Sequence, residues 1–73
     1  MKVSGWYESE YGASFFDYER ATLKAIAVDM LDDFHSDCVG VDVDANDEHG
    51  NDVSSKLMTL LMLLDNNTIK GDD

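Results

Sequence analysis

The sequence predicts one small acidic α+β domain over residues 1–73, in which short strands pack with two helices in the order strand, helix, strand, helix. A chain of 73 residues has room for a single domain. Its apolar share of 44% is that of a folded protein and not of a disordered acidic tail. Along the chain, the spacing of the hydrophobic residues also changes between the period of a strand and the period of a helix.

The first half of the chain predicts a strand followed by a helix. Residues 2–7 form the opening strand, and a polar turn ends at Gly12. Ser14 is the predicted cap of a helix that runs to Phe34, because apolar residues recur at helical spacing between them. The residues of this apolar stripe are Phe16, Leu23, Ile26, Ala27, Met30, Leu31 and Phe34.

The third element is a strand over residues 38–44. Its valines alternate with glycine and aspartate, which is typical of a half-buried strand with a charged outer face. A polar loop over residues 45–51 follows. After the second helix, residues 68–70 add a last short strand in this interpretation.

The second helix begins after Asp52 or Ser54 and is predicted to end at Leu64. It is apolar over most of its circumference, so it needs cover on more than one side. A homodimer through this helix would supply that cover. The sequence leaves open an alternative, in which the helix lies between the sheet and the first helix. The predicted dimer interface contains Leu57, Met58, Leu60, Leu61, Met62 and Leu64.

The chain is strongly acidic, with 16 acids against 5 bases and a formal net charge of −11. Residues 25–55 contain no Lys or Arg. Such a field repels nucleic acid and anionic lipid and attracts basic surfaces. Direct binding to nucleic acid or to a membrane is therefore not expected. The longest apolar run, residues 60–64, is also too short for a membrane span or a secretory signal, which predicts a cytoplasmic protein.

Several of these acids are placed where they oppose helix formation. Asp29, Asp32 and Asp33 lie near the C-terminal end of the predicted first helix, which carries partial negative charge. An acid at such a position costs about 0.3–1 kcal/mol. Asp29 and Asp33 are also a like-charge pair four residues apart, which costs about a further 0.2–0.5 kcal/mol. This placement indicates a role beyond solubility.

No metal or other cofactor is expected. The segment from Asp42 to Glu48 resembles the opening of an EF-hand loop, but Asp47 stands where the loop needs glycine and Val53 where it needs a bidentate glutamate. A structural zinc site uses four Cys and His ligands. The chain offers three, which are His35, Cys38 and His49.

An enzyme is not expected either. The carboxylate pairs Asp32–Asp33 and Asp42–Asp44 lie on predicted exposed faces, whereas acid–base catalysis needs a carboxyl group whose pKa is shifted by its surroundings. The sequence has no nucleophile motif and no glycine-rich phosphate loop. It is also too short to enclose a substrate pocket comfortably.

Small size, strong acidity, the lack of a reaction motif and a regular array of carboxylates together resemble the phage-encoded DNA-mimic inhibitors. These are host-takeover proteins that occupy the DNA-binding surface of nucleoid-associated, restriction, repair or CRISPR proteins. The resemblance is one of composition. It implies a basic DNA-binding protein of the host as partner, with carboxylates in place of phosphates. The carboxylates in question are Asp29, Asp32, Asp33, Asp37, Asp42, Asp44, Asp47 and Glu48.

Two other classes remain open. An immunity-type or antitoxin-type inhibitor would bind one specific basic enzyme, with its affinity concentrated in aromatic anchors such as Trp6 or Tyr7. A halophilic domain would carry its acids only as an adaptation to salt. The excess of Asp over Glu agrees with the halophilic interpretation, and the excess of Lys over Arg argues against it.

Overall fold

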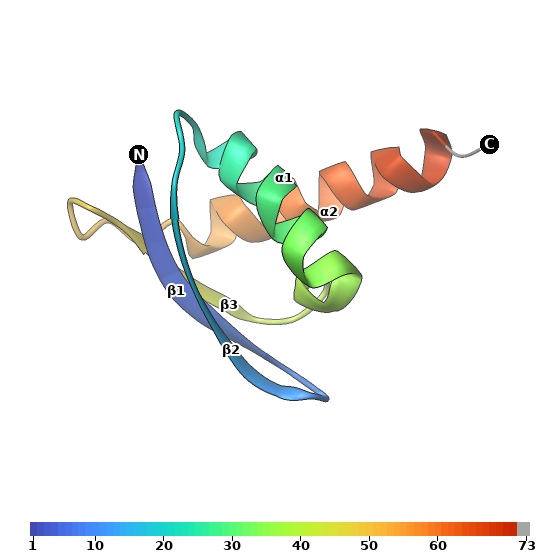
Figure 1. Cartoon of the computed structure of the whole chain (residues 1–73), viewed down its shortest axis with the longest axis horizontal. Coiled ribbons are helices and arrows are strands. Elements are labelled where there is room, and N and C mark those ends of the chain that lie inside the picture. Colours follow the sequence, from blue (N-terminus) through green and yellow to red (C-terminus); the bar gives the residue numbers. More distant parts are fainter. Residues whose placement is uncertain (72–73) are drawn as a thin grey trace.

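The computed structural model describes the backbone of residues 1–71 and the side chains of residues 1–66. The elements are β1 (Lys2–Ser9), β2 (Gly12–Glu19), α1 (Leu23–Phe34), the 3₁₀ turn η1 (His35–Cys38), β3 (Val43–Asp47) and α2 (Ser54–Gly71). The strands form one antiparallel sheet in the order β2-β1-β3 (Figure 1). The predicted α+β class is confirmed, but the predicted order of elements is not, because two strands precede the first helix.

Strand β2 replaces the first part of the predicted long helix. The segment is a strand because its residues alternate between two faces: Phe16 and Tyr18 are buried, whereas Phe15 and Asp17 are exposed. Phenylalanine and tyrosine also favour strands. The adjacent pair Phe15 and Phe16 hides this alternation in the sequence, because both residues look like core residues. The prediction that Ser14 caps a helix is therefore wrong.

Helix α1 begins at Leu23 and is capped by Thr22, whose hydroxyl accepts a hydrogen bond from the N–H of Ala25 at 3.2 Å. This arrangement is the usual way in which threonine satisfies a free donor at a helix start. The predicted end at Phe34 is confirmed. The helix stops there because His35 takes a backbone φ of 56°.

Strand β3 lies further along the chain than predicted, at Val43–Asp47 and not at residues 38–44. Val39 and Val41 are half-buried but precede the strand, so the alternation of valines continues through a segment that is not paired. Within β3 the two faces do differ as predicted. Val43 is buried, and Asp44 is exposed on the other face.

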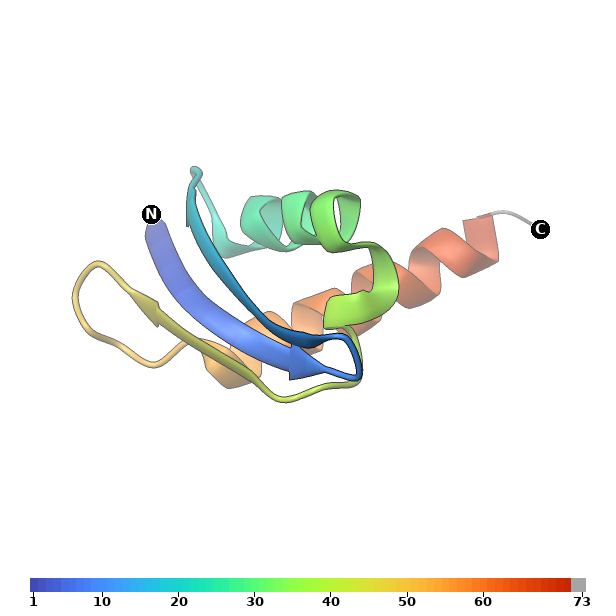
Figure 2. The ribbon, with the colours of Figure 1, turned by 60° about the horizontal axis from the view of Figure 1, so that its bottom comes forward.

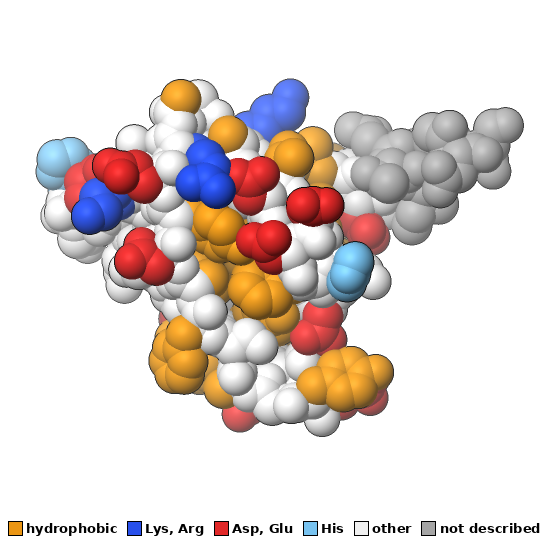
Figure 3. Space-filling model, in the orientation of Figure 1, with side chains coloured by type: hydrophobic (Ala, Val, Ile, Leu, Met, Phe, Trp, Pro, Cys, Tyr) orange, Lys and Arg blue, Asp and Glu red, His pale blue; other side chains and the backbone are white. Residues whose placement is uncertain are grey.

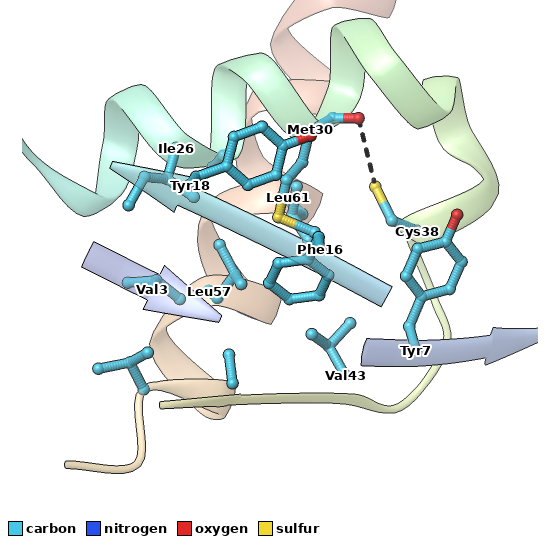
Figure 4. Close-up of a cluster of buried hydrophobic side chains, with 13 residues drawn as sticks. Val3, Tyr7, Phe16, Tyr18, Ile26, Met30, Cys38, Val43, Leu57 and Leu61 are labelled. Atoms are coloured by element: carbon cyan, nitrogen blue, oxygen red, sulfur yellow. Dashed lines mark hydrogen bonds between the residues drawn. The ribbon is translucent and has the colours of Figure 1, made fainter. Parts of the chain in front are cut away.

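Helix α2 runs to Gly71 and includes residues 68–70, so the predicted last strand is wrong. Both helices cover the same face of the sheet and leave the other face open (Figure 2). Leu57 and Leu61 are 0% exposed and pack into the core between the sheet and α1 (Figure 4). The apolar circumference of α2 had two explanations, a homodimer and a position between the sheet and α1. The second explains why Leu57 and Leu61 are buried within the single chain. Neither helix, over the described residues, is long and apolar enough to cross a membrane.

Strand β1 approaches β3 so closely that one position requires glycine. A Cβ atom added to Gly5 would lie 1.9 Å from the backbone oxygen of Asp44. We therefore expect Gly5→Ala to force β1 and β3 apart and to lower the free energy of unfolding by about 2 kcal/mol or more. Ser4→Ala, on the open face, is the control and should change it by no more than about 0.5 kcal/mol. Urea denaturation measures both variants, and equal small effects would contradict this close approach.

Candidate partner-binding surfaces

Three of the predicted acids form a line beside the hairpin of β1 and β2. Asp29 and Asp33 lie on α1 four residues apart, and Asp37 follows in η1 after four more. Asp29 and Asp33 both lie within α1, so their Cβ atoms are about 5–6 Å apart. Asp37 follows the break in the helix at His35. We call Asp29, Asp33 and Asp37 the carboxylate row.

Every member of the carboxylate row is held by a side chain of the hairpin or of the residue that follows it. The donors are one guanidinium and three hydroxyl groups. The pairs are Arg20 with Asp29, Tyr18 with Asp33 (2.5 Å), Tyr7 with Asp37 (3.2 Å) and Ser9 with Asp37 (3.1 Å). These contacts fasten α1 and η1 to the sheet and fix the direction of each carboxylate.

The carboxylate row therefore has a structural cause that the sequence does not reveal. A hydrogen bond contributes about 0.5–1.5 kcal/mol, and more when one partner is charged. This range is similar to the cost of an acid near a helix C-terminus. The hydrogen bonds to the hairpin offset that cost, so these acids do not by themselves require a functional explanation.

The same contacts change the chemistry of the tyrosines. Burial, followed by the hydrogen bond to Asp33, raises the pKa of Tyr18 well above its usual value. Burial is also the main reason that the pKa of Tyr7 is raised, and Asp37 adds to the effect. Both hydroxyl groups therefore keep their protons, and remain donors to the carboxylate row, throughout the neutral range.

Two further predicted acids hold the turn after β3. The Asp47 carboxylate accepts the N–H groups of His49 and Asn51, each at 2.9 Å. The bond from Asn51 is the largest reason that the pKa of Asp47 is lowered. Glu48 accepts the N–H of Lys2 at 2.8 Å. Asp47 thus holds the turn together, and Glu48 joins the turn to β1.

The remaining predicted acids are exposed. Asp32 lies on α1, Asp42 precedes β3, and Asp44 lies on the open face of the sheet. Among the described side chains, none makes a hydrogen bond or an ion pair with these three. Figure 3 shows acidic side chains spread across the face of the molecule on which α1 lies, with hydrophobic side chains between them. The structure therefore divides the predicted acids between the α1 side and the sheet side.

The open face of the sheet carries an aromatic pair. Trp6 is 39% exposed and Phe15 is 77% exposed, and their ring centroids lie 6.4 Å apart. Tyr7, the other predicted anchor, is 1% exposed and belongs to the core, so it has no surface for a partner. The predicted anchors do not name Phe15. Neighbouring residues of a strand face opposite sides, so an adjacent Phe pair in a strand would have revealed an exposed ring.

Only part of the predicted dimer interface is on the surface. Leu57 and Leu61 lie in the core and cannot contact a second subunit in this structure. Leu60 and Leu64 are half-buried, as is Met58. Met62 is exposed, as is Leu63, which was not predicted to belong to the interface. The exposed and half-buried residues form the surface that α2 offers to a second copy. Homodimer formation stays a prediction.

The candidate metal ligands do not meet. Cys38 is buried, and burial raises the pKa of its thiol to about 11. His35 and His49 are both exposed. Over the part of the chain that the structure describes, no three side chains of His, Cys, Asp or Glu come together as metal ligands.

Comparison of the chain with protein families, with curated proteins and with solved structures gives no match.

The tyrosine–carboxylate contacts predict a loss of stability in alkali. Because the pKa of Tyr18 and of Tyr7 is raised in the folded protein, the unfolded chain releases these protons first as the pH rises above about 10. The buried thiol of Cys38 also has a raised pKa, so the unfolded chain releases this proton first from about pH 8.5 upward. The free energy of unfolding should therefore begin to fall near that pH and fall more steeply above about pH 10. Urea denaturation between about pH 8 and pH 11 checks this.

The variant Tyr18→Phe isolates the contribution of one hydroxyl. It should cost about 1 kcal/mol at neutral pH, because the bond to Asp33 is lost, and it should weaken the alkaline dependence. Tyr11→Phe, at an exposed tyrosine of the hairpin turn, is the control. It should change neither the stability at neutral pH nor the alkaline dependence. An alkaline fall that is the same in all three proteins would contradict the role of Tyr18.

Proposed function

We propose that this protein is a non-catalytic inhibitor that presents carboxylates in place of DNA phosphates. In this proposal it occupies the DNA-binding surface of a basic host protein of the nucleoid-associated, restriction, repair or CRISPR type, as a phage early protein would. The observation that best supports the proposal is the carboxylate row, whose side chains are already fixed by the hairpin. The exposed Asp32, which lies on α1 with Asp29 and Asp33, adds a fourth carboxylate to the three of the row.

Fixed carboxylates suit this role for two reasons. An ionised carboxylate has about four acceptor positions, so one or two hydrogen bonds within the protein leave others for a partner. A side chain that is held before binding also loses little rotamer freedom on binding, and this loss otherwise costs about 0.5–1.5 kcal/mol for each side chain. The lysines and arginines that bind phosphates form similar charge-assisted hydrogen bonds with carboxylates.

The size of the molecule fits a short piece of duplex. Its middle dimension is 28 Å. Duplex DNA of that length carries about 16 charges, because one charge occurs every ~1.7 Å of axis. The whole chain has 16 acids, but only those on one side can act together. One copy would therefore replace part of such a duplex, and a homodimer through the exposed residues of α2 would present twice as many carboxylates.

A second function has one observation in its favour. The exposed pair of Trp6 and Phe15 is the kind of aromatic anchor that concentrates affinity in specific interfaces. An immunity-type or antitoxin-type inhibitor of one basic enzyme would use it. Such an inhibitor would bind one partner that DNA does not displace, whereas a DNA mimic competes with DNA directly.

A capture experiment separates the two functions. The purified protein is used to recover partners from bacterial lysate, with and without competing duplex DNA. DNA mimicry predicts basic DNA-binding proteins that are lost when the duplex is added. A single partner that the duplex leaves in place would support the immunity-type function. If no partner is recovered, both functions are contradicted, and the acids serve only to keep the protein solvated.

The proposal also predicts which charges matter. Replacing Asp32, Asp33 and Asp37 by Asn keeps acceptors for the hairpin but removes three charges from α1 and η1. We expect this variant to bind the recovered DNA-binding protein about 3- to 150-fold more weakly, because three charge contacts of about 0.2–1 kcal/mol each are lost. Its affinity should also depend less on salt.

The matched control removes three other predicted charges, with Asp42→Asn, Asp44→Asn and Glu48→Gln. Both variants have the same net charge, so a difference between them reports position. Displacement of a labelled duplex from the partner, measured at several salt concentrations, gives both affinities. The control should weaken binding less than the first variant. Equal losses would contradict a greater role for the carboxylate row than for the acids of the sheet side.

A further inference from the structure

The open face of the sheet is more than an acidic surface, because its centre is aromatic. Trp6 on β1 is opposite Phe15 on β2, and the two rings are tilted by 35°. Neither side chain is covered by a helix, since both helices lie on the other face (Figure 2). Large apolar side chains that lie together on an exposed face are typical of binding sites.

Carboxylates border this aromatic pair. Asp17 follows Phe15 by two residues on the same face, at about 6.8 Å along the strand. Asp44 on β3 is opposite Trp6 in the antiparallel register. Beside the pair lies a hollow of about 330 Å³. Its lining residues are Lys2, Ser4, Asp17, Asp47 and Glu48.

Aromatic faces next to carboxylates are suited to the guanidinium group of arginine. This group is planar, stacks on aromatic rings and forms paired hydrogen bonds with a carboxylate. A phosphate or a nucleic acid would instead be repelled by Asp17 and Asp44. Charge complementarity therefore favours a basic protein segment as the occupant of this face.

The edge of β2 is open to a further strand. Met1 and Arg20 exchange two backbone hydrogen bonds, at 2.8 and 3.0 Å. In an antiparallel pair such exchanges occur at alternate residues, so the residues between them direct their N–H and C=O groups to the free edge. On β2 these residues are Ala13, Phe15, Asp17 and Glu19, of which Glu19 already has its C=O bonded to the Arg20 guanidinium at 2.7 Å.

The opposite edge of the sheet is not open in this way. Residues that follow the turn after β3 return along it, and the N–H of Val53 donates to the C=O of Ala45 at 3.0 Å. The hydroxyl of Ser54 also accepts the N–H of Ala45 at 2.8 Å. An added strand can therefore pair with β2 and not with the middle of β3.

We propose that the edge of β2 and the open face of the sheet bind an extended segment that carries arginine at alternate positions. The segment pairs with β2 as a fourth strand. Side chains opposite each other in paired strands lie on the same face, with Cβ atoms about 4.5–5.5 Å apart. An arginine opposite Phe15 or Asp17 thus reaches both a ring and a carboxylate. The basic character of this partner rests on the proposed function, and the segment is separate from the surface that meets the carboxylate row.

A second copy of the chain is a less suitable occupant. Each copy carries a net charge of −11, and an added β2 would bring its own acids to the same edge. Pairing of two copies through β2 would appear as dimer formation in the absence of any peptide.

The only tryptophan of the chain is Trp6, so its fluorescence reports on this face alone. The probe is an eight-residue peptide in which arginine alternates with threonine. We expect saturable binding, with a change in Trp6 emission and in the amide NMR signals of Phe15 and Asp17. The same peptide with lysine should bind about two- to fivefold more weakly, because stacking on the rings is reduced. The peptide with glutamate should not bind.

Three variants test the site without changing the core. Phe15→Ala and Asp17→Asn, both at exposed positions, should each weaken binding of the arginine peptide. Asp32→Asn removes a charge on α1, across the molecule, and should weaken binding of this peptide less than Asp17→Asn does. Equal weakening by Asp17→Asn and Asp32→Asn would overturn the site in favour of general charge attraction. Lack of saturation with the arginine peptide, or dimer formation through β2 without peptide in sedimentation experiments, would overturn it too.

The two proposals can fail separately. If the protein does not compete with DNA but still binds the arginine peptide, the DNA-mimic function is contradicted and the arginine-binding face is retained. If the protein competes with DNA but does not bind the arginine peptide, the docking of a strand on β2 is contradicted and the role of the carboxylate row is retained.

Discussion

The hydrogen bonds between the hairpin and the carboxylate row hold the two layers of this protein together at their border. A chain of 73 residues buries a small core, and its single cysteine makes no internal disulfide. Hydroxyl groups from β1 and β2 reach Asp33 and Asp37, so α1 and η1 cannot rotate away from the sheet without losing them. The strong acidity of the chain, which opposes compact folding, is used here to make contacts that favour it.

This arrangement links stability with recognition. The carboxylates that fasten α1 are also the ones that face solvent in a fixed order, so the same contacts that stabilise the fold prepare a charged surface. The open face of the sheet differs, because Trp6 and Phe15 concentrate apolar surface between acids. The first surface suits a partner that binds many phosphates, and the second suits one that inserts a few side chains. Under the two proposals, this small protein would bind a basic partner at two separate surfaces.

The sequence predicted features that depend on residues close together in the chain. It missed features that depend on how the strands pair in the sheet. The end of α1 at Phe34 followed from apolar spacing, whereas a central position for α2 was only the alternative to the predicted homodimer. Strand β2 was not predicted, because Phe16 lies at helical spacing from Leu23 and therefore fits the apolar stripe of the predicted first helix. The contact of Tyr18 with Asp33 joins residues 15 apart, and it could be predicted only after β2 had been recognised. For the same reason the sequence indicated the acids but not which of them are held by the fold.

A double-mutant cycle on Tyr18 and Asp33 tests the central claim most directly. Tyr18→Phe, Asp33→Ala and the combined variant are compared with the unchanged protein by urea denaturation at neutral pH. If the hydrogen bond fastens α1 to the sheet, the two changes are coupled by about 1 kcal/mol, because the second change removes nothing once the first has broken the bond. If the effects of the two changes simply add, the bond does not hold the layers together, and the carboxylate row is not fixed by the hairpin.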